Sequence, residues 1–140
     1  MAQVAVVIDT CVVIGFLRGS EPDKTCFVKL LKSSEGLLTA VTVFELLVGS
    51  ERDSKKQKAV TQLLGFLGVL PFDKEAAGIA AVIGKKLREQ GSVIGTRDIF
   101  IAGICLAHKL PIVTGNREHF ARVPGLKVLS PAALASSQRG

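Results

Sequence analysis

A continuous run of apolar, mostly β-branched residues near the start of the chain constrains the fold most. The run covers residues 4–8, Val-Ala-Val-Val-Ile, and it stops at Asp9 and Thr10. Such a run is typical of a central strand in a parallel sheet, because helices cover both faces of that strand. The sequence therefore predicts that this segment lies at the centre of the fold and ends at a carboxylate.

The rest of the chain alternates between apolar runs and amphipathic segments. Further strands are predicted over residues 36–41, 69–72, 112–113 and 126–129. Helices are predicted over residues 11–17, 21–32, 42–49, 53–65, 74–90 and 98–110. This alternation predicts an α/β fold, a three-layer α/β/α sandwich around a mostly parallel sheet of four or five strands. We see no repeat or linker, so residues 1–130 are expected to form a single domain and residues 131–140 a short, frayed tail.

The composition narrows the class of protein. Hydrophobic residues make up 48% of the chain and no apolar run approaches the roughly 20 residues of a membrane span, so we expect no membrane segment. The amino terminus lacks a basic leader, which favours a cytoplasmic protein. The three cysteines have no CxxC spacing and are expected to be reduced thiols. A net charge of +6 favours a polyanionic partner such as nucleic acid.

Four polar residues are predicted at one edge of the sheet. Asp9 ends the first strand, Asn116 follows the strand over 112–113, and Glu45 and Asp98 lie near the starts of helices. Sites in parallel sheets form beyond the carboxyl ends of the strands, so these side chains are expected to converge. Asp98 precedes the apolar run 99–107, and its charge costs several kcal/mol unless it is paired.

Each carboxylate also has a purely structural explanation. Asp9 and Asp98 are candidates to cap the helices that follow them, and Thr42-x-x-Glu45 matches a capping box. Three carboxylates roughly 5 Å apart, however, would repel one another by about 3 kcal/mol per pair at an effective dielectric constant of about 20. A divalent cation removes that repulsion, and a set of hard oxygen ligands favours Mg²⁺ or Mn²⁺ over Zn²⁺.

Basic residues near these carboxylates point to a phosphate-containing substrate. Arg97, Arg117 and Arg122 are candidates to meet phosphates, whereas the lysine groups on 55–58 and 85–88 are more typical of solvated helix faces. An acidic cluster beside a basic surface suits phosphodiester hydrolysis, in which a metal ion positions and deprotonates a water molecule. A phosphotransfer domain built on Asp9 is disfavoured, because Cys11 stands where the second aspartate is needed.

Five segments together carry a resemblance to a known family. In chain order they are Val7-Ile8-Asp9-Thr10, Thr42-Val43-Phe44-Glu45-Leu46-Leu47-Val48-Gly49, Asp98-Ile99-Phe100-Ile101-Ala102, Ile112-Val113-Thr114-Gly115-Asn116 and Phe120-Ala121-Arg122-Val123-Pro124-Gly125-Leu126. The ordered set resembles the PIN domain, most closely the ribonuclease toxins of VapC type. The resemblance implies a PIN-like nuclease domain over residues 1–130 and a magnesium-dependent endoribonuclease, with Mn²⁺ as a substitute. It also implies a homodimer or higher oligomer and a cognate antitoxin protein that covers the acidic groove.

The resemblance also implies roles for individual residues. Asp9, Glu45 and Asp98 are the expected metal ligands, and with Asn116 they make up the expected catalytic set. Expected substrate contacts are Thr10, Arg97, Thr114 and Arg117.

The chain departs from the most acidic form of the family pattern at two places. Asn116 stands where some relatives have an aspartate, and His119 stands where an acid often precedes the phenylalanine, with Glu118 one position away. Fewer charges favour one strongly bound ion, with Asn116 orienting a water molecule or ligand. An alternative function, a non-cleaving RNA-binding or regulatory PIN-like module, rests on the same substitution. The RNA, the antitoxin and the oligomer interface stay open.

Overall fold

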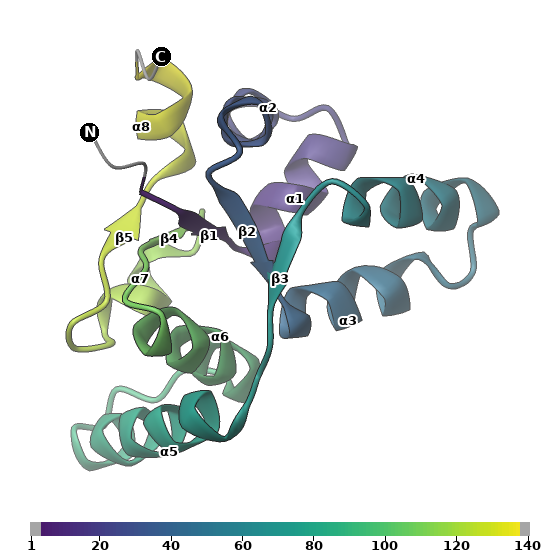
Figure 1. The fold of residues 1–140 in the computed structure, drawn as a ribbon. Coiled ribbons are helices and arrows are strands. Elements are labelled where there is room, and N and C mark those ends of the chain that lie inside the picture. The colour runs from purple at the N-terminus through teal and green to yellow at the C-terminus, as the bar shows by residue number, and fades with distance from the viewer. Residues whose placement is uncertain (1–3, 138–140) are drawn as a thin grey trace.

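The computed structural model describes residues 4–137, and their centre is a five-stranded sheet in which all neighbouring strands are parallel (Figure 1). The strands are β1 (Val6–Ile8), β2 (Gly36–Thr39), β3 (Gly68–Leu70), β4 (Ile112–Val113) and β5 (Val128–Leu129). Their order in the sheet is β3-β2-β1-β4-β5. The chain therefore builds outward from β1 in one direction and then returns to build outward from its other side. The predicted α/β fold with a parallel sheet is confirmed.

Helices cover both faces of the sheet. They are α1 (Thr10–Leu17), α2 (Asp23–Ser33), α3 (Ala40–Ser50), α4 (Ser54–Leu64), α5 (Lys74–Glu89), α6 (Thr96–Ala107), α7 (Arg117–Ala121) and α8 (Pro131–Ser136). One apolar cluster joins the sheet to α1, α2, α4 and α8, and a second joins it to α5, α6 and α7. Figure 1 shows α5 and α6 on the opposite side of the sheet from α1 and α2, with α3 and α4 side by side beyond β3.

Strand β1 explains why the first apolar run has no polar alternation. Val6 and Ile8 belong to the apolar cluster that includes α1 and α2, whereas Val7, on the other face, belongs to the cluster that includes α6. All three side chains are at most 1% exposed. A strand buried on both faces needs apolar residues at every position, as the sequence predicts.

Two segments contain helices that are not among the helices predicted from the sequence. The polar turn that follows β4 contains α7, which is anchored by the fully buried Phe120. The predicted tail from residue 131 contains α8, because Ser130 caps its amino terminus and Leu134 is buried beside α2. Residues 138–140 of that tail lie outside the described residues. The division between a domain and a tail at residue 130 stays a prediction.

No helix among residues 4–137 is long and apolar enough to cross a membrane. The longest, α5, runs beside α6 with small residues at the contact. A Cβ atom built on Gly103 of α6 would lie 2.6 Å from the carbonyl oxygen of Ala76 and 2.9 Å from the Cβ atom of Ala80. The two backbones approach so closely because the contact has no room for a larger side chain. This packing fixes the position of α6, whose first turn carries Asp98.

Gly103→Ala tests this close contact. The added methyl group meets backbone atoms of α5, so we expect the free energy of unfolding to fall by about 1–3 kcal/mol in a urea titration. Gly78→Ala is the matched control, since Gly78 is an exposed position of α5 with open space around it. Its helix propensity should raise stability by about 0.5–1 kcal/mol. Equal stabilities of the two variants would contradict the packing described for α6.

Candidate active site

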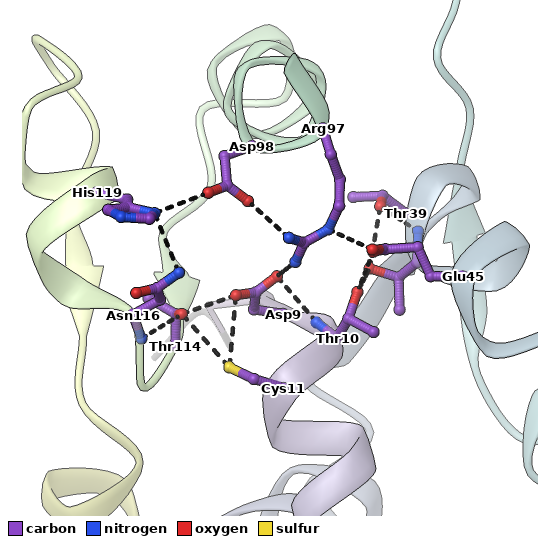
Figure 2. Close-up of polar contacts among 11 residues, drawn as sticks. Asp9, Thr10, Cys11, Thr39, Glu45, Arg97, Asp98, Thr114, Asn116 and His119 are labelled. Carbon is purple, nitrogen blue, oxygen red and sulfur yellow. Dashed lines mark hydrogen bonds and ion pairs between the residues drawn. The ribbon is translucent and has the colours of Figure 1, made fainter. Parts of the chain in front are cut away.

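The candidate active site lies at the carboxyl edge of the sheet, where the strand order reverses between β1 and β4. Asp9 follows β1 and Thr114 follows β4, and the Asp9 amide donates to the Val113 carbonyl at 3.0 Å. Glu45 projects from α3, and Arg97 and Asp98 project from the first turn of α6 (Figure 2). The topology thus brings three carboxylates from distant parts of the sequence to one place, as the sequence predicts.

The guanidinium group of Arg97 lies among the three carboxylates. Its Nη1 atom is 3.3 Å from Asp98 Oδ1, its Nη2 atom is 3.6 Å from Asp9 Oδ1, and its Nε atom contacts Glu45 Oε2. Burial would lower the pKa of Arg97, but the contacts with Glu45, Asp98 and Asp9 outweigh burial and raise it. Arg97 is therefore firmly cationic, and it supplies the partner that the charge of Asp98 requires.

Asp9 is almost fully buried and is held by three further donors, one of which is the Cys11 thiol, 3.5 Å from its Oδ2 atom. Its Oδ1 atom accepts from the Thr10 amide at 2.9 Å, and its Oδ2 atom accepts from the Thr114 hydroxyl at 2.7 Å. Burial raises the pKa of Asp9, while the Thr114 hydrogen bond and the charge of Arg97 act in the opposite direction. Asp9 does cap α1, but its second oxygen faces Thr114 across the sheet. Capping therefore accounts for only one of its contacts.

Glu45 does not act in a capping box. Helix α3 begins at Ala40, before Thr42, and its N-cap is Thr39, whose hydroxyl accepts from the Thr42 amide at 3.1 Å. The capping-box explanation of Glu45 is therefore wrong, because its premise places the helix start too late. Glu45 instead accepts a hydrogen bond from the Thr10 hydroxyl at 2.6 Å and contacts Arg97.

Asp98 is the third residue of α6, and the helix is capped by Gly95, so the capping explanation of Asp98 is also wrong. Its Oδ2 atom lies 3.1 Å from Nδ1 of His119. Its Oδ1 atom is buried and accepts no hydrogen bond, although the guanidinium of Arg97 faces it. Asp98 therefore keeps one buried oxygen that is available to a cation.

Asn116, predicted as the fourth catalytic residue, is exposed and lies beyond His119. Its Nδ2 atom is 3.1 Å from His119 Nδ1, the same nitrogen that faces Asp98. One ring nitrogen cannot donate to a carboxylate and accept from an amide at the same time, so only one of these contacts is a hydrogen bond at any moment. Asn116 is joined to the cluster in two ways, because its side chain contacts His119 and its backbone amide donates to the Thr114 hydroxyl at 2.9 Å (Figure 2).

The other residues predicted to contact substrate fall into two groups. Thr10 and Thr114 are buried, and their hydroxyls are hydrogen bonded to Glu45 and Asp9, so both support the carboxylates. Arg117 is exposed, and the described residues give it no contact with the cluster. Arg122 donates to the Val93 carbonyl at 3.1 Å and ties α7 to the loop before α6.

Sequence reasoning missed two features of the site. It assigned Arg97 to substrate phosphates and did not place it between the carboxylates. It also gave His119 no role, although His119 contacts Asp98. A signal was available in each case, because Arg97 is adjacent to Asp98 in one helical turn, and His119 takes a position where the family often has an acid.

The three predicted metal ligands do not surround a single metal-sized position in this structure. Among residues 4–137, no three His, Cys, Asp or Glu side chains are grouped closely enough to hold a metal ion. The guanidinium of Arg97 lies between the three carboxylates instead. The chemistry of the donors still fits a hard cation, because they are all carboxylate oxygens and Asp98 Oδ1 is buried without a hydrogen bond. Asp9, Glu45 and Asp98 would hold such an ion.

Comparison with known proteins identifies the family. The model of the PIN domain matches residues 6–126. The chain belongs to the PIN domain family. A tRNA(fMet)-specific endonuclease VapC from Salmonella typhimurium is 30% identical, over 70% of this chain and 76% of the relative. A ribonuclease VapC from Rickettsia bellii is 28% identical, over 89% of this chain and 94% of the relative. This PIN domain protein therefore belongs to the VapC ribonucleases, a family that includes members of toxin–antitoxin systems.

Solved structures agree with the family assignment. The structure of DNA-bound VapBC from Salmonella typhimurium superposes with a TM-score of 0.80 at 25% identity, covering 91% of this chain and 98% of that one. FitAcB from Neisseria gonorrhoeae gives a TM-score of 0.71 at 27% identity, with the same coverage. The PIN-like fold predicted from the sequence is thus confirmed.

Proposed function

We propose that this PIN domain ribonuclease is a magnesium-dependent endoribonuclease, with Mn²⁺ as a substitute, whose catalytic carboxylates are Asp9, Glu45 and Asp98. The observation that carries this proposal is their convergence from β1, α3 and α6 at the point where the strand order reverses. Asp9 and Asp98 are 1% and 3% exposed, so keeping both ionised is costly without a cation. Ordinary folding stability gives no reason to place them together.

The metal ion and the residues around the carboxylates would have different roles in the reaction. When bound, Mg²⁺ would activate a water molecule and stabilise the charge that develops on the scissile phosphate. Thr114 and Thr10 fix the carboxylates of Asp9 and Glu45 through hydrogen bonds. Asn116, at the exposed edge of the site, would orient a water molecule or a phosphodiester oxygen. RNA is the substrate class, and the net charge of +6 favours its approach.

The tRNA class is the first substrate to test, since relatives from Salmonella typhimurium and Shigella flexneri are described as tRNA(fMet)-specific. The second candidate function, an RNA-binding or regulatory module that does not cut, rests on Asn116 in place of an acid. It predicts RNA binding that is unchanged by magnesium and no cleavage of any RNA.

Asp98→Asn tests the proposed chemistry. The amide keeps the shape of the side chain but removes one ligand charge, so cleavage of initiator tRNA should fall by more than the roughly 10- to 100-fold that is typical of changes outside the first ligand shell. EDTA should abolish cleavage by the unchanged protein, and Mg²⁺ or Mn²⁺ should restore it. Glu89→Gln is the control, because it removes the same charge from an exposed position at the end of α5 and should cleave normally. Cleavage that survives both EDTA and Asp98→Asn would contradict the proposal.

We also propose a place for the antitoxin. The solved complexes of relatives contain VapB or FitA type partners, as in VapBC from Salmonella typhimurium and FitAcB from Neisseria gonorrhoeae. This chain has a groove of about 390 Å³ between α1, α3 and α4 that extends to Glu45. Its lining includes the apolar residues Ile14, Leu17, Leu46, Ala59 and Val60. Arg18, Lys55 and Lys56 also line it, so the groove suits a segment with apolar and acidic side chains.

Leu17→Glu tests the groove. Leu17 is 39% exposed, so a glutamate there should fold normally but should place a charge against the apolar face of the antitoxin. We expect binding of the cognate antitoxin, measured by calorimetry, to weaken while RNA cleavage persists. Val82→Glu on α5 is the control, because Val82 is a similarly exposed apolar residue in a different groove. If only Val82→Glu lost binding, the antitoxin would bind to the face of α5 and the proposed groove would be wrong.

The predicted homodimer stays a prediction. Helix α3 exposes three large apolar side chains, Phe44 at 66%, Leu47 at 44% and Val48 at 46%. Such a patch is typical of a protein interface. This patch on α3 is consistent with association of the chain with another protein surface, but it does not show which surface covers the patch.

A further inference from the structure

The position of Arg97 raises a question that the proposed metal chemistry does not answer. Its guanidinium contacts all three carboxylates that the proposed function assigns to a divalent cation. A positive charge is needed here in any case, because three carboxylates in one partly buried site repel one another. Arg97 meets that need from within the chain.

Arg97 meets the need only in part. One guanidinium faces three carboxylates, so the cluster keeps a negative formal charge. The contacts are uneven as well, since Asp9 lies 3.6 Å away and Asp98 Oδ1 accepts no hydrogen bond from the guanidinium. The tightest contact is with Glu45, whose side chain is 24% exposed. A compact divalent ion would neutralise the buried pair of Asp9 and Asp98 more completely.

The side chain of Arg97 is more exposed than the three carboxylates that it contacts. Its side chain is 41% exposed, and it extends from the first turn of α6 on a flexible stem. Asp98, which comes next in the chain, is packed inward and is only 3% exposed. The arginine can therefore leave the cluster without moving α6, whereas the two buried aspartates cannot. A phosphate of the substrate would give the displaced, planar guanidinium a bidentate partner.

We propose that Arg97 is an internal counter-cation that competes with the divalent metal for Asp9, Glu45 and Asp98, and turns to the RNA phosphate once displaced. This inference rests on the proposed function, because it presumes that a metal binds to these carboxylates. It assigns one residue to two successive partners and couples the metal affinity to the RNA affinity. By linkage, if bound metal raises the affinity for RNA by some factor, bound RNA raises the affinity for the metal by the same factor.

A fixed ion-pair network is the competing explanation. In that case Arg97 would hold the carboxylates in place, and its removal would disperse them and weaken metal binding. Competition predicts the opposite sign. The direction of the change in metal affinity therefore separates the two explanations before any RNA is added.

The test is a calorimetric titration of Mn²⁺ into the full chain and into Arg97→Gln. Competition predicts that Arg97→Gln binds Mn²⁺ about tenfold or more tightly than the unchanged protein, within the usual range of coupling between sites. Arg117→Gln is the matched control, because it removes the same charge from an exposed position that contacts none of the three carboxylates among the described residues, and its affinity should change little. Equal or weaker binding by Arg97→Gln would overturn the inference.

A second readout protects the test against misfolding of the variant. Without metal, Arg97→Gln should unfold at a lower temperature than the unchanged protein, and Mn²⁺ should raise its midpoint by more than it raises that of the unchanged protein. In the unchanged protein, the Nε–H resonance of Arg97 should shift as Mg²⁺ is added and saturate with the site. A resonance that does not move while Mg²⁺ binds would also overturn the inference.

The same experiments distinguish this inference from the proposed function. If neither the unchanged protein nor Arg97→Gln binds metal saturably, the proposed metal chemistry fails and the inference fails with it. If the unchanged protein binds metal and loses it in Asp98→Asn, but Arg97→Gln binds no more tightly, only the role of Arg97 fails.

Discussion

The structure of the site depends on the balance of charge among Asp9, Glu45, Asp98 and Arg97. Two of the carboxylates are almost fully buried, and burial raises the pKa of Asp9. Left alone, they would repel each other and favour protonation. The guanidinium of Arg97 offsets part of the negative charge of this cluster, and the hydroxyls of Thr10 and Thr114 donate hydrogen bonds to two of its members. Because that balance is incomplete, we propose that the site accepts a cation of higher charge.

The fold supplies the geometry that this balance requires. Reversal of the strand order places the ends of β1 and β4 side by side, so that Asp9 and Thr114 meet although 105 residues separate them. The close packing of α5 against α6 at Gly103 fixes the helix that carries Arg97 and Asp98. Each element is ordinary, and the site arises because they end at one edge of the sheet. The same arrangement accounts for the superposition on VapBC and FitAcB structures.

Much of the fold could be predicted from local patterns. The run ending at Asp9 indicated a strand buried on both faces, and alternation indicated the parallel sheet. The positions of Asp9, Glu45 and Asp98 followed because parallel strands share one carboxyl edge. The contacts of Arg97 and His119 were not predictable in this way, since they depend on side-chain directions that a linear pattern does not contain. The capping-box explanation of Glu45 was wrong because the N-cap of the helix is Thr39, three residues before Thr42.

The most direct test of the central claim is the anomalous scattering of Mn²⁺ in crystals of the protein. Our account predicts one strong peak in contact with carboxylate oxygens of Asp9 and Asp98. It also predicts that the guanidinium of Arg97 has left Glu45 in the same crystal. A peak at another place, or Mn²⁺ bound while Arg97 still contacts all three carboxylates, would contradict the account.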